Sequence, residues 1–168
     1  MKQVLFALGA MLASACTTEA VSPFPQDTRV VFVGERAREL VRQCSRTSPG
    51  PVEGTWTPAD SDLDSLESEL PALIQRELHD RWPNDDARPL DYYRQYGGLV
   101  IAGQRIIYVS GFHRRLIEHN PMMTPRNPTL TWRDVAMQVC DGGPIVFGVE
   151  YNPRTRVFAH FAFNGAID

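Results

Sequence analysis

The sequence predicts an α+β fold, with two or three N-terminal helices packed on one face of a four- to five-stranded antiparallel sheet. Apolar residues recur at helical spacing in the first half of the chain. Apolar runs of strand length, separated by turn residues, dominate the second half. Helices followed by strands are typical of this class.

The first elements are short. Residues 30–33 form a β-branched and aromatic run that predicts a strand, ended by Gly34. Residues 35–44 predict a helix, because their apolar positions fall at i, i+3, i+4 and i+7. Cys44 is the last of these positions and is expected on the apolar face of the helix.

A second, longer helix has a clear start signal. Thr57 is the expected N-cap, Pro58 the first helical residue and Asp60 the acidic residue at N3. Pro71 interrupts the pattern, so either the helix bends there or two short helices meet. The apolar stripe consists of Leu63, Leu66, Leu70, Leu73, Ile74 and Leu78.

The second half begins with a predicted hairpin. Residues 96–102 and 105–112 are apolar runs separated by Gly103-Gln104, and Gly103 suits a type II′ turn. Three prolines between residues 119 and 131 indicate a long loop.

Three further runs have a strand pattern, at residues 135–140, 145–151 and 157–163. An antiparallel sheet covered on one side leaves its other face to solvent. That open face is expected to hold Glu150, Phe158 and His160.

The N-terminus has the layout of a secretory signal. Lys2 is followed by an apolar run at residues 4–12 and small residues at 13–15. The run is too short to span a bilayer as a helix, which needs about 20 residues. We therefore expect a signal peptide at 1–15, a tether at 16–29 and a single globular domain at 30–168.

Cys16 directly follows this leader. The sequence Leu12-Ala13-Ser14-Ala15-Cys16 resembles the lipobox of bacterial lipoproteins. The resemblance implies that Cys16 is acylated and anchors the chain to a membrane, and Thr17 in place of Asp implies the outer membrane, facing the periplasm. Leucine stands one residue earlier than in the usual pattern, so cleavage without acylation, giving a soluble periplasmic or secreted protein, is the alternative.

The cysteine count then leaves one pair. With Cys16 acylated, Cys44 and Cys140 remain, and an oxidising periplasm favours a disulfide between them. The alternatives are two buried free thiols, or Cys140 as a nucleophile paired with a histidine.

The part of the chain from Tyr93 onward resembles a group of uncharacterised proteobacterial secreted proteins. The segments that carry the resemblance are GLVIAGQRIIYVSGF, CDGGPIVFGVEYNP and FAFNG. It implies no activity.

Composition and motifs argue against several classes of function. The formal net charge is −3 and the arginines are scattered, so we expect no nucleic-acid partner. His113 and His119 lack a metal-binding spacing, and Asp60, Asp62 and Asp64 are interpreted as charges at a helix start. We predict no metal, no cofactor and no catalytic residue.

A candidate binding surface is proposed instead, with an aromatic and basic cluster before the hairpin at its centre. The alternative is that the tyrosines are half-buried at the entry to a strand. The surface residues are Tyr92, Tyr93, Arg94, His113, Arg114, Arg115 and His160.

These observations favour an envelope lipoprotein with a protein partner in the envelope, such as an inhibitor, an immunity-type protein or an accessory factor. The alternative is a small envelope hydrolase whose site is assembled from distant residues. A deep pocket that joins a histidine to a carboxylate or to a free Cys140 would favour the enzyme. A flat sheet face would favour the binding module.

Overall fold

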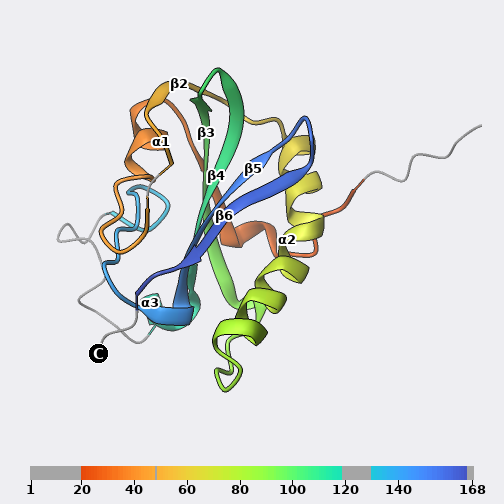
Figure 1. Cartoon of the computed structure of the whole chain (residues 1–168), viewed down its shortest axis with the longest axis vertical. Coiled ribbons are helices and arrows are strands. Elements are labelled where there is room, and N and C mark those ends of the chain that lie inside the picture. Colours follow the sequence, from red (N-terminus) through yellow and green to blue (C-terminus); the bar gives the residue numbers. More distant parts are fainter. Residues whose placement is uncertain (1–19, 48, 119–129, 166–168) are drawn as a thin grey trace, which may run out of the picture.

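The computed structural model describes residues 20–47, 49–118 and 130–165. In these residues the chain forms an α+β fold with three α-helices and a six-stranded sheet (Figure 1). The helices are α1 (Glu35–Glu39), α2 (Asp60–Arg81) and α3 (Arg114–Glu118). The strands are β1 (Arg29–Phe32), β2 (Val52–Trp56), β3 (Tyr92–Ile101), β4 (Gln104–His113), β5 (Val146–Asn152) and β6 (Val157–Phe163).

The sheet is mixed, which corrects the predicted antiparallel sheet of four or five strands. Its order is β1-β3-β4-β5-β6, and β1 runs parallel to β3. Strand β2 pairs with the other half of β3, so β1 and β2 lie end to end along one edge. Strand β2 was not predicted, because its glycine and polar residues hide the alternating pattern on which such predictions depend.

The helices lie on both faces of the sheet, and not on one as predicted. Helix α2 packs on one face and α1 on the opposite face (Figure 1). Strand β4 shows why: Ile107 and Val109 join the core under α2, whereas Ile106 and Tyr108 join the core under α1. A continuous apolar run of this kind is typical of a strand buried on both sides.

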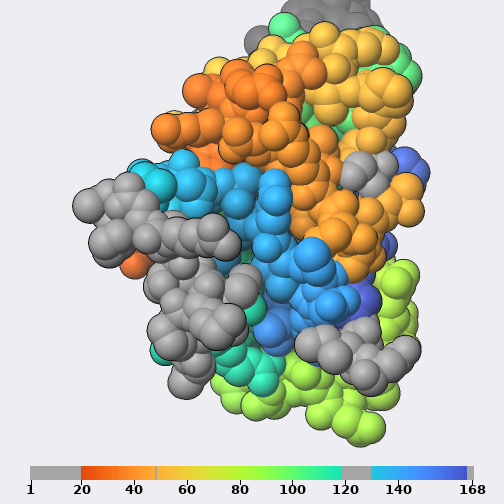
Figure 2. Space-filling view, turned by 90° about the vertical axis from the view of Figure 1, so that its left-hand side faces the viewer, coloured from red at the N-terminus to blue at the C-terminus, as the bar shows by residue number. Residues whose placement is uncertain are grey.

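The face expected to be open is therefore largely covered. Figure 2 views the molecule from this side, and α1, the loop after it and the segment from residue 130 to 145 spread across the strands. A third apolar cluster lies here, built from Phe112, Leu116, Met137, Val139 and Val146. We call this side the loop-covered face.

Helix α2 confirms the predicted apolar stripe, whose six residues are all buried. It runs unbroken through Pro71 and begins at Asp60, later than predicted. The N-cap is Ala59, whose backbone N–H donates to the Asp62 carboxylate at 3.1 Å. Helix α1 is shorter than predicted and ends at Glu39.

The predicted hairpin is confirmed as β3–β4, but its turn is of another type. Ile101 pairs with Gln104, so Ala102 and Gly103 are the two central residues. Their φ angles are 48° and 69°. Positive φ at both positions defines a type I′ turn, whereas the predicted type II′ turn has it only at the first.

Residues 135–140 do not form the predicted strand. The backbone of this region is hydrogen-bonded to a buried side chain and not to a neighbouring strand. The Gln95 amide donates to the carbonyls of Trp132 and Val135, at 2.5 and 2.7 Å, and its oxygen accepts from the backbone N–H of Met137 at 2.9 Å. The loop is thus fixed across β3 without joining the sheet.

A disulfide joins Cys44 to Cys140, as predicted, with 5.0 Å between the Cα atoms. Both cysteines lie in loops, and not on a helix face and at a strand end. The bond therefore ties the loop after α1 to the segment that crosses the loop-covered face.

The N-terminal part of the described chain packs against the core. Phe24 is 3% exposed, and the Arg94 guanidinium lies 3.8 Å above the centre of its ring. The packed structure therefore includes a residue of the segment interpreted as a tether. Cys16 lies outside the described residues, and no helix within them is long and apolar enough to span a bilayer.

Candidate functional site

The structure does not bring the predicted surface residues together. Along β3, Tyr92 and Arg94 point toward α2 and are fully buried. Tyr93 points to the loop-covered face, where its ring lies 4.9 Å from that of Trp132. Alternate residues of a strand face opposite sides, so this cluster is divided by the sheet itself.

Arg94 belongs to a buried polar network under α2. Its Nε donates to Glu67 at 3.1 Å and to the Tyr96 hydroxyl at 3.0 Å, and its Nη1 donates to the Tyr92 carbonyl at 2.6 Å. The Tyr96 hydroxyl donates to the same Glu67 oxygen at 2.6 Å. Arg29 donates to the other oxygen at 3.0 Å. Every member holds its neighbours in place, so we assign the network a structural role.

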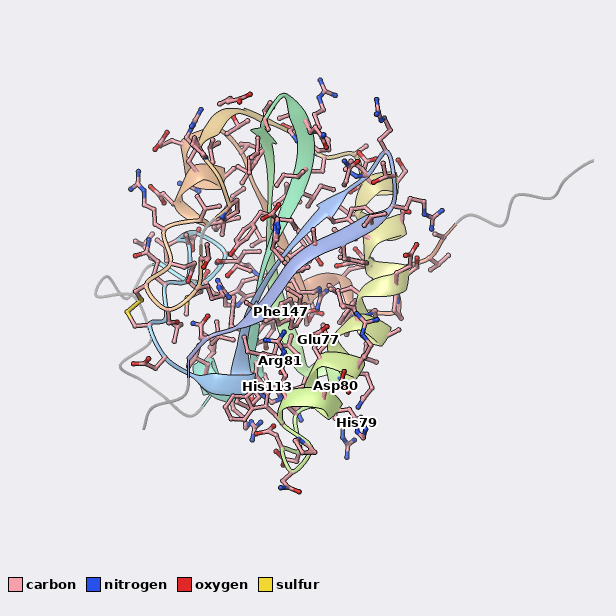
Figure 3. The ribbon with its side chains drawn as sticks, viewed as in Figure 1. Glu77, His79, Asp80, Arg81, His113 and Phe147 are labelled. Atoms are coloured by element: carbon pink, nitrogen blue, oxygen red, sulfur yellow. A yellow bond between two sulfur atoms is a disulfide. The ribbon has the colours of Figure 1, made fainter. Side chains whose placement is uncertain are left out.

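His113 is also buried, near the C-terminal end of α2 (Figure 3). Its Nδ1 accepts from the backbone N–H and the Nε of Arg115, at 3.1 and 3.2 Å. Burial and the charge of Arg115 lower the pKa of His113. Its ring lies edge-on to Tyr92 with 5.2 Å between centroids, so it is a packed residue and not a free base.

Arg114 and Arg115 are surface residues whose charges are already balanced. Arg114 lies 3.5 Å from Asp91, and Arg115 binds Asp85 and Asp86 at 3.2 and 2.9 Å. Exposed ion pairs of this kind contribute little to stability. They form a local charge cluster, and His160 belongs to neither of their ion-pair groups.

His160 is the one predicted surface residue that lines a described pocket. Its Nδ1 lies 2.8 Å from Glu150, and the two residues are on neighbouring strands of the loop-covered face. The pocket has a volume of about 340 Å³ and combines this pair with apolar walls. We call it the His160 pocket; its lining residues are Thr47, Pro49, Gly50, Ile101, Glu150, His160, Phe161 and Ala162.

The backbone of His160 is unusual. Its φ is 53°, a left-handed conformation that L-amino acids other than glycine rarely adopt. The register between β5 and β6 shifts nearby, between Gly148 and Glu150. Bulges of this kind redirect a side chain and are frequent next to functional sites.

A second hollow lies near the start of α2. It has a volume of about 470 Å³ and is formed by the tips of the two hairpins and the start of α2. Arg105 lies 5.3 Å from the Trp56 ring, and Asn152 donates to Gln104 at 3.2 Å. Several of its polar groups thus already contact one another.

Arg46 is a notable residue that sequence reasoning missed. It is 8% exposed and lies against Gly148 on the loop-covered face. A single arginine in a loop gives no sequence signal of burial, since arginine is mostly exposed. Only the packed loop shows that this charge is enclosed.

The chemistry open to these residues is limited. Cys140 is in the disulfide and is no thiolate nucleophile. Within the described part of the chain, no three His, Cys, Asp or Glu side chains gather as metal ligands would. The His160–Glu150 pair can bind a polar group or exchange a proton with it.

Comparison of the chain with protein-family models, with curated proteins and with solved structures returned no match.

Proposed function

We propose that this chain is a cell-envelope lipoprotein, anchored through Cys16, whose domain binds a ligand or a partner segment in the His160 pocket. The lipobox-like leader supports the anchor and the outer-membrane location. The disulfide supports an oxidising compartment, where such bonds persist. The pocket supports the binding role.

The observation that carries this proposal is the strained and exposed histidine. A left-handed conformation costs a residue with a side chain roughly 1–2 kcal/mol. His160 adopts it although its side chain is 76% exposed, so no burial of the ring offsets that cost. Strain retained at a surface pocket points to a functional constraint.

The lining suits a small ligand or a peptide end. Pockets that bind such groups are mostly apolar with a few polar groups that fix orientation. Here Pro49, Ile101 and Phe161 supply apolar surface, and Glu150 and His160 supply the polar pair. The Glu150 side chain is only 13% exposed, so the pair is oriented before any ligand arrives.

The second candidate, a small hydrolase, is favoured by the same pair, since a histidine oriented by a carboxylate is the arrangement of a general base. A nucleophile would have to lie within hydrogen-bond reach of it. Thr47 lines the pocket, but no hydrogen bond joins it to His160 in the described structure. Binding is therefore the function that the geometry supports best.

Site-specific photo-crosslinking in the native envelope tests the binding role. A photoreactive phenylalanine analogue at Thr47 leaves His160 intact and should give one discrete adduct, lost in a His160→Ala background. The same analogue at His79 is the control, because His79 points away from the sheet near the end of α2 (Figure 3).

Two results would contradict the proposal. One is the same set of adducts from both positions. The other is the absence of any adduct at Thr47 together with turnover of a model ester that His160→Ala abolishes, which would establish the hydrolase instead.

A further inference from the structure

Arg46 carries a buried charge that has no counter-charge among the described residues. Its side-chain nitrogens Nε, Nη1 and Nη2 are enclosed and have no hydrogen-bond partner among the described residues. No described Asp or Glu lies within 4.0 Å of them, since Arg46 takes part in none of the ion pairs found there. An arginine cannot shed its proton to avoid this situation.

Arg94 shows how the same fold treats its other enclosed arginine. Arg94 is 0% exposed and is met by a carboxylate, a hydroxyl and a backbone carbonyl. Buried charges in proteins are usually paired in this way. The isolation of Arg46 is therefore specific to its site.

The guanidinium of Arg46 fits against β5 because residue 148 is a glycine. A Cβ at Gly148 would lie 2.8 Å from its Cζ and 2.9 Å from its Nε, so a larger residue on β5 would displace the group. The Tyr108 hydroxyl would also contact this Cβ, and it lies beside the guanidinium. Tyr108 is 3% exposed, so its hydroxyl is enclosed together with the guanidinium.

A second hydroxyl lies across the strand pair. Ser110 on β4 pairs directly with Gly148, which places its Cβ about 5 Å from the point where Arg46 approaches. Ser110 is 1% exposed, and its hydroxyl has no hydrogen-bond partner in the part of the chain that the structure describes. A guanidinium and a hydroxyl without a partner, here those of Arg46 and Ser110, are donors of the kind that oxyanions accept from.

The neighbouring carboxylate is already engaged. Glu150 pairs directly with Tyr108 across β4 and β5, but its side chain binds His160. Glu150 also lines the His160 pocket, as does Thr47, the residue after Arg46. The loop that encloses Arg46 is thus a wall of that pocket.

We propose that Arg46, with the hydroxyls of Tyr108 and Ser110, forms an oxyanion subsite behind the His160 pocket, which binds a carboxylate or phosphate group of the ligand. This inference rests on the proposed binding function of the pocket and names the class of its ligand. The rest of the ligand occupies the His160 pocket.

Thermal denaturation of the full chain with simple anions tests the subsite. Sodium acetate and sodium phosphate are the two probes, each compared with sodium chloride at equal ionic strength. A probe that binds the folded state raises the midpoint as its concentration increases. We expect the wild type to respond to at least one probe, and the one with the larger response identifies the group.

The variant Arg46→Gln should need at least about tenfold more of that probe for the same rise, since a charge-assisted hydrogen bond is lost. Arg42→Gln is the matched control, because Arg42 is exposed and paired with Glu35, and it should respond as the wild type does. Ser110→Ala provides a second measurement should Arg46→Gln fail to fold. The Ser110 hydroxyl has no hydrogen-bond partner among the described residues, so its removal should change the stability little. The Ser110→Ala variant should nevertheless respond more weakly to the probe.

Four results would overturn the subsite. The first is a wild type whose midpoint rises no more with either probe than with chloride. The second and third are responses of Arg46→Gln or of Ser110→Ala that equal the wild-type response. The fourth is a loss of stability in Asp168→Asn as large as the loss in Arg46→Gln. The last would mean that the counter-charge belongs to the chain itself, since Asp168 lies outside the described residues. If instead the Thr47 crosslink persists while these tests fail, the pocket still binds and only the class of ligand is wrong.

Discussion

Glu67 and Arg94 form an ion pair 3.1 Å long in which neither side chain is exposed to solvent. Glu67 comes from α2 and Arg94 from β3, so the pair joins the longest helix to the centre of the sheet. Arg29 on β1 and Tyr96 on β3 share the same carboxylate. One carboxylate thus links a helix and two strands.

Removal of that carboxylate should be costly. Glu67→Gln leaves the fully buried Arg94 without a counter-charge, whereas Arg29 keeps its pair with Asp64 at 3.1 Å. We expect a loss of about 3–5 kcal/mol in the free energy of unfolding. Glu69→Gln is the control, because Glu69 pairs with Arg156 in an exposed bridge that contributes at most about 1 kcal/mol. Urea denaturation measures both. Equal losses in the two variants would contradict the structural role of the network.

The disulfide should be the second large contribution to stability. Its cysteines are 96 residues apart, and the chain-entropy model gives about 4–5 kcal/mol for a loop of that size, an upper figure. The double variant Cys44→Ser, Cys140→Ser should unfold at a lower urea concentration than the wild type, and reducing agent should shift only the wild type. Thiol labelling of the unfolded, non-reduced chain supplies the check. Labelling of both Cys44 and Cys140 would show that the disulfide is not formed.

The β3–β4 turn holds a correctable strain. Ala102 occupies a left-handed position at which Asn is favoured, and Asn-Gly is the preferred pair for a type I′ turn. We expect Ala102→Asn to raise the free energy of unfolding by about 0.5–1 kcal/mol. Gly103→Ala should lower it, because Gly103 also has positive φ. Opposite signs in the two variants, measured by urea denaturation, are the expected result, and a loss of stability in Ala102→Asn would contradict the turn type.

The features predicted well from the sequence were local. The apolar stripe of α2 and the β3–β4 hairpin each depend on residues close together in the chain, where spacing carries the signal. The disulfide was predicted from the cysteine count, from the compartment and from the expected placement of Cys44 on a helix face and Cys140 at a strand end. Its partners proved to lie in loops, which the pattern around Cys44 did not indicate.

The features missed depend on contacts between distant segments. The parallel pairing of β1 with β3 and the opposite placement of α1 and α2 leave no trace in a local window. Residues 135–140 have a strand pattern, yet the Gln95 side chain binds their backbone in place of a strand. Arg46 was missed for the same reason, since it is enclosed only when its loop packs on β5.

Acylation at Cys16 is a separate prediction of the proposed function. Metabolic labelling with a fatty-acid analogue should mark the wild type, and Cys16→Ala should remove the label. Cys44→Ala serves as the comparison, because its thiol is in the disulfide and its loss should leave the label unchanged. Equal labelling of wild type and Cys16→Ala would remove the anchor and leave a periplasmic or secreted protein.

His113 should make stability depend on pH. Burial and the charge of Arg115 lower its pKa in the folded state below the ordinary value of 6.5. As the pH falls, the unfolded chain takes up the proton first, so folded-state stability is complete above about 6.5 and decreases below it. The geometry agrees, since Nδ1 accepts from two donors of Arg115 and a proton there would oppose both.

His113→Phe keeps a ring against Tyr92 and should flatten the dependence of stability on pH between pH 7 and 5, although the variant is less stable overall. His79→Gln, at an exposed position, should retain the wild-type slope, and urea denaturation across this range compares the three. A wild-type slope in His113→Phe would assign the pH dependence to other groups.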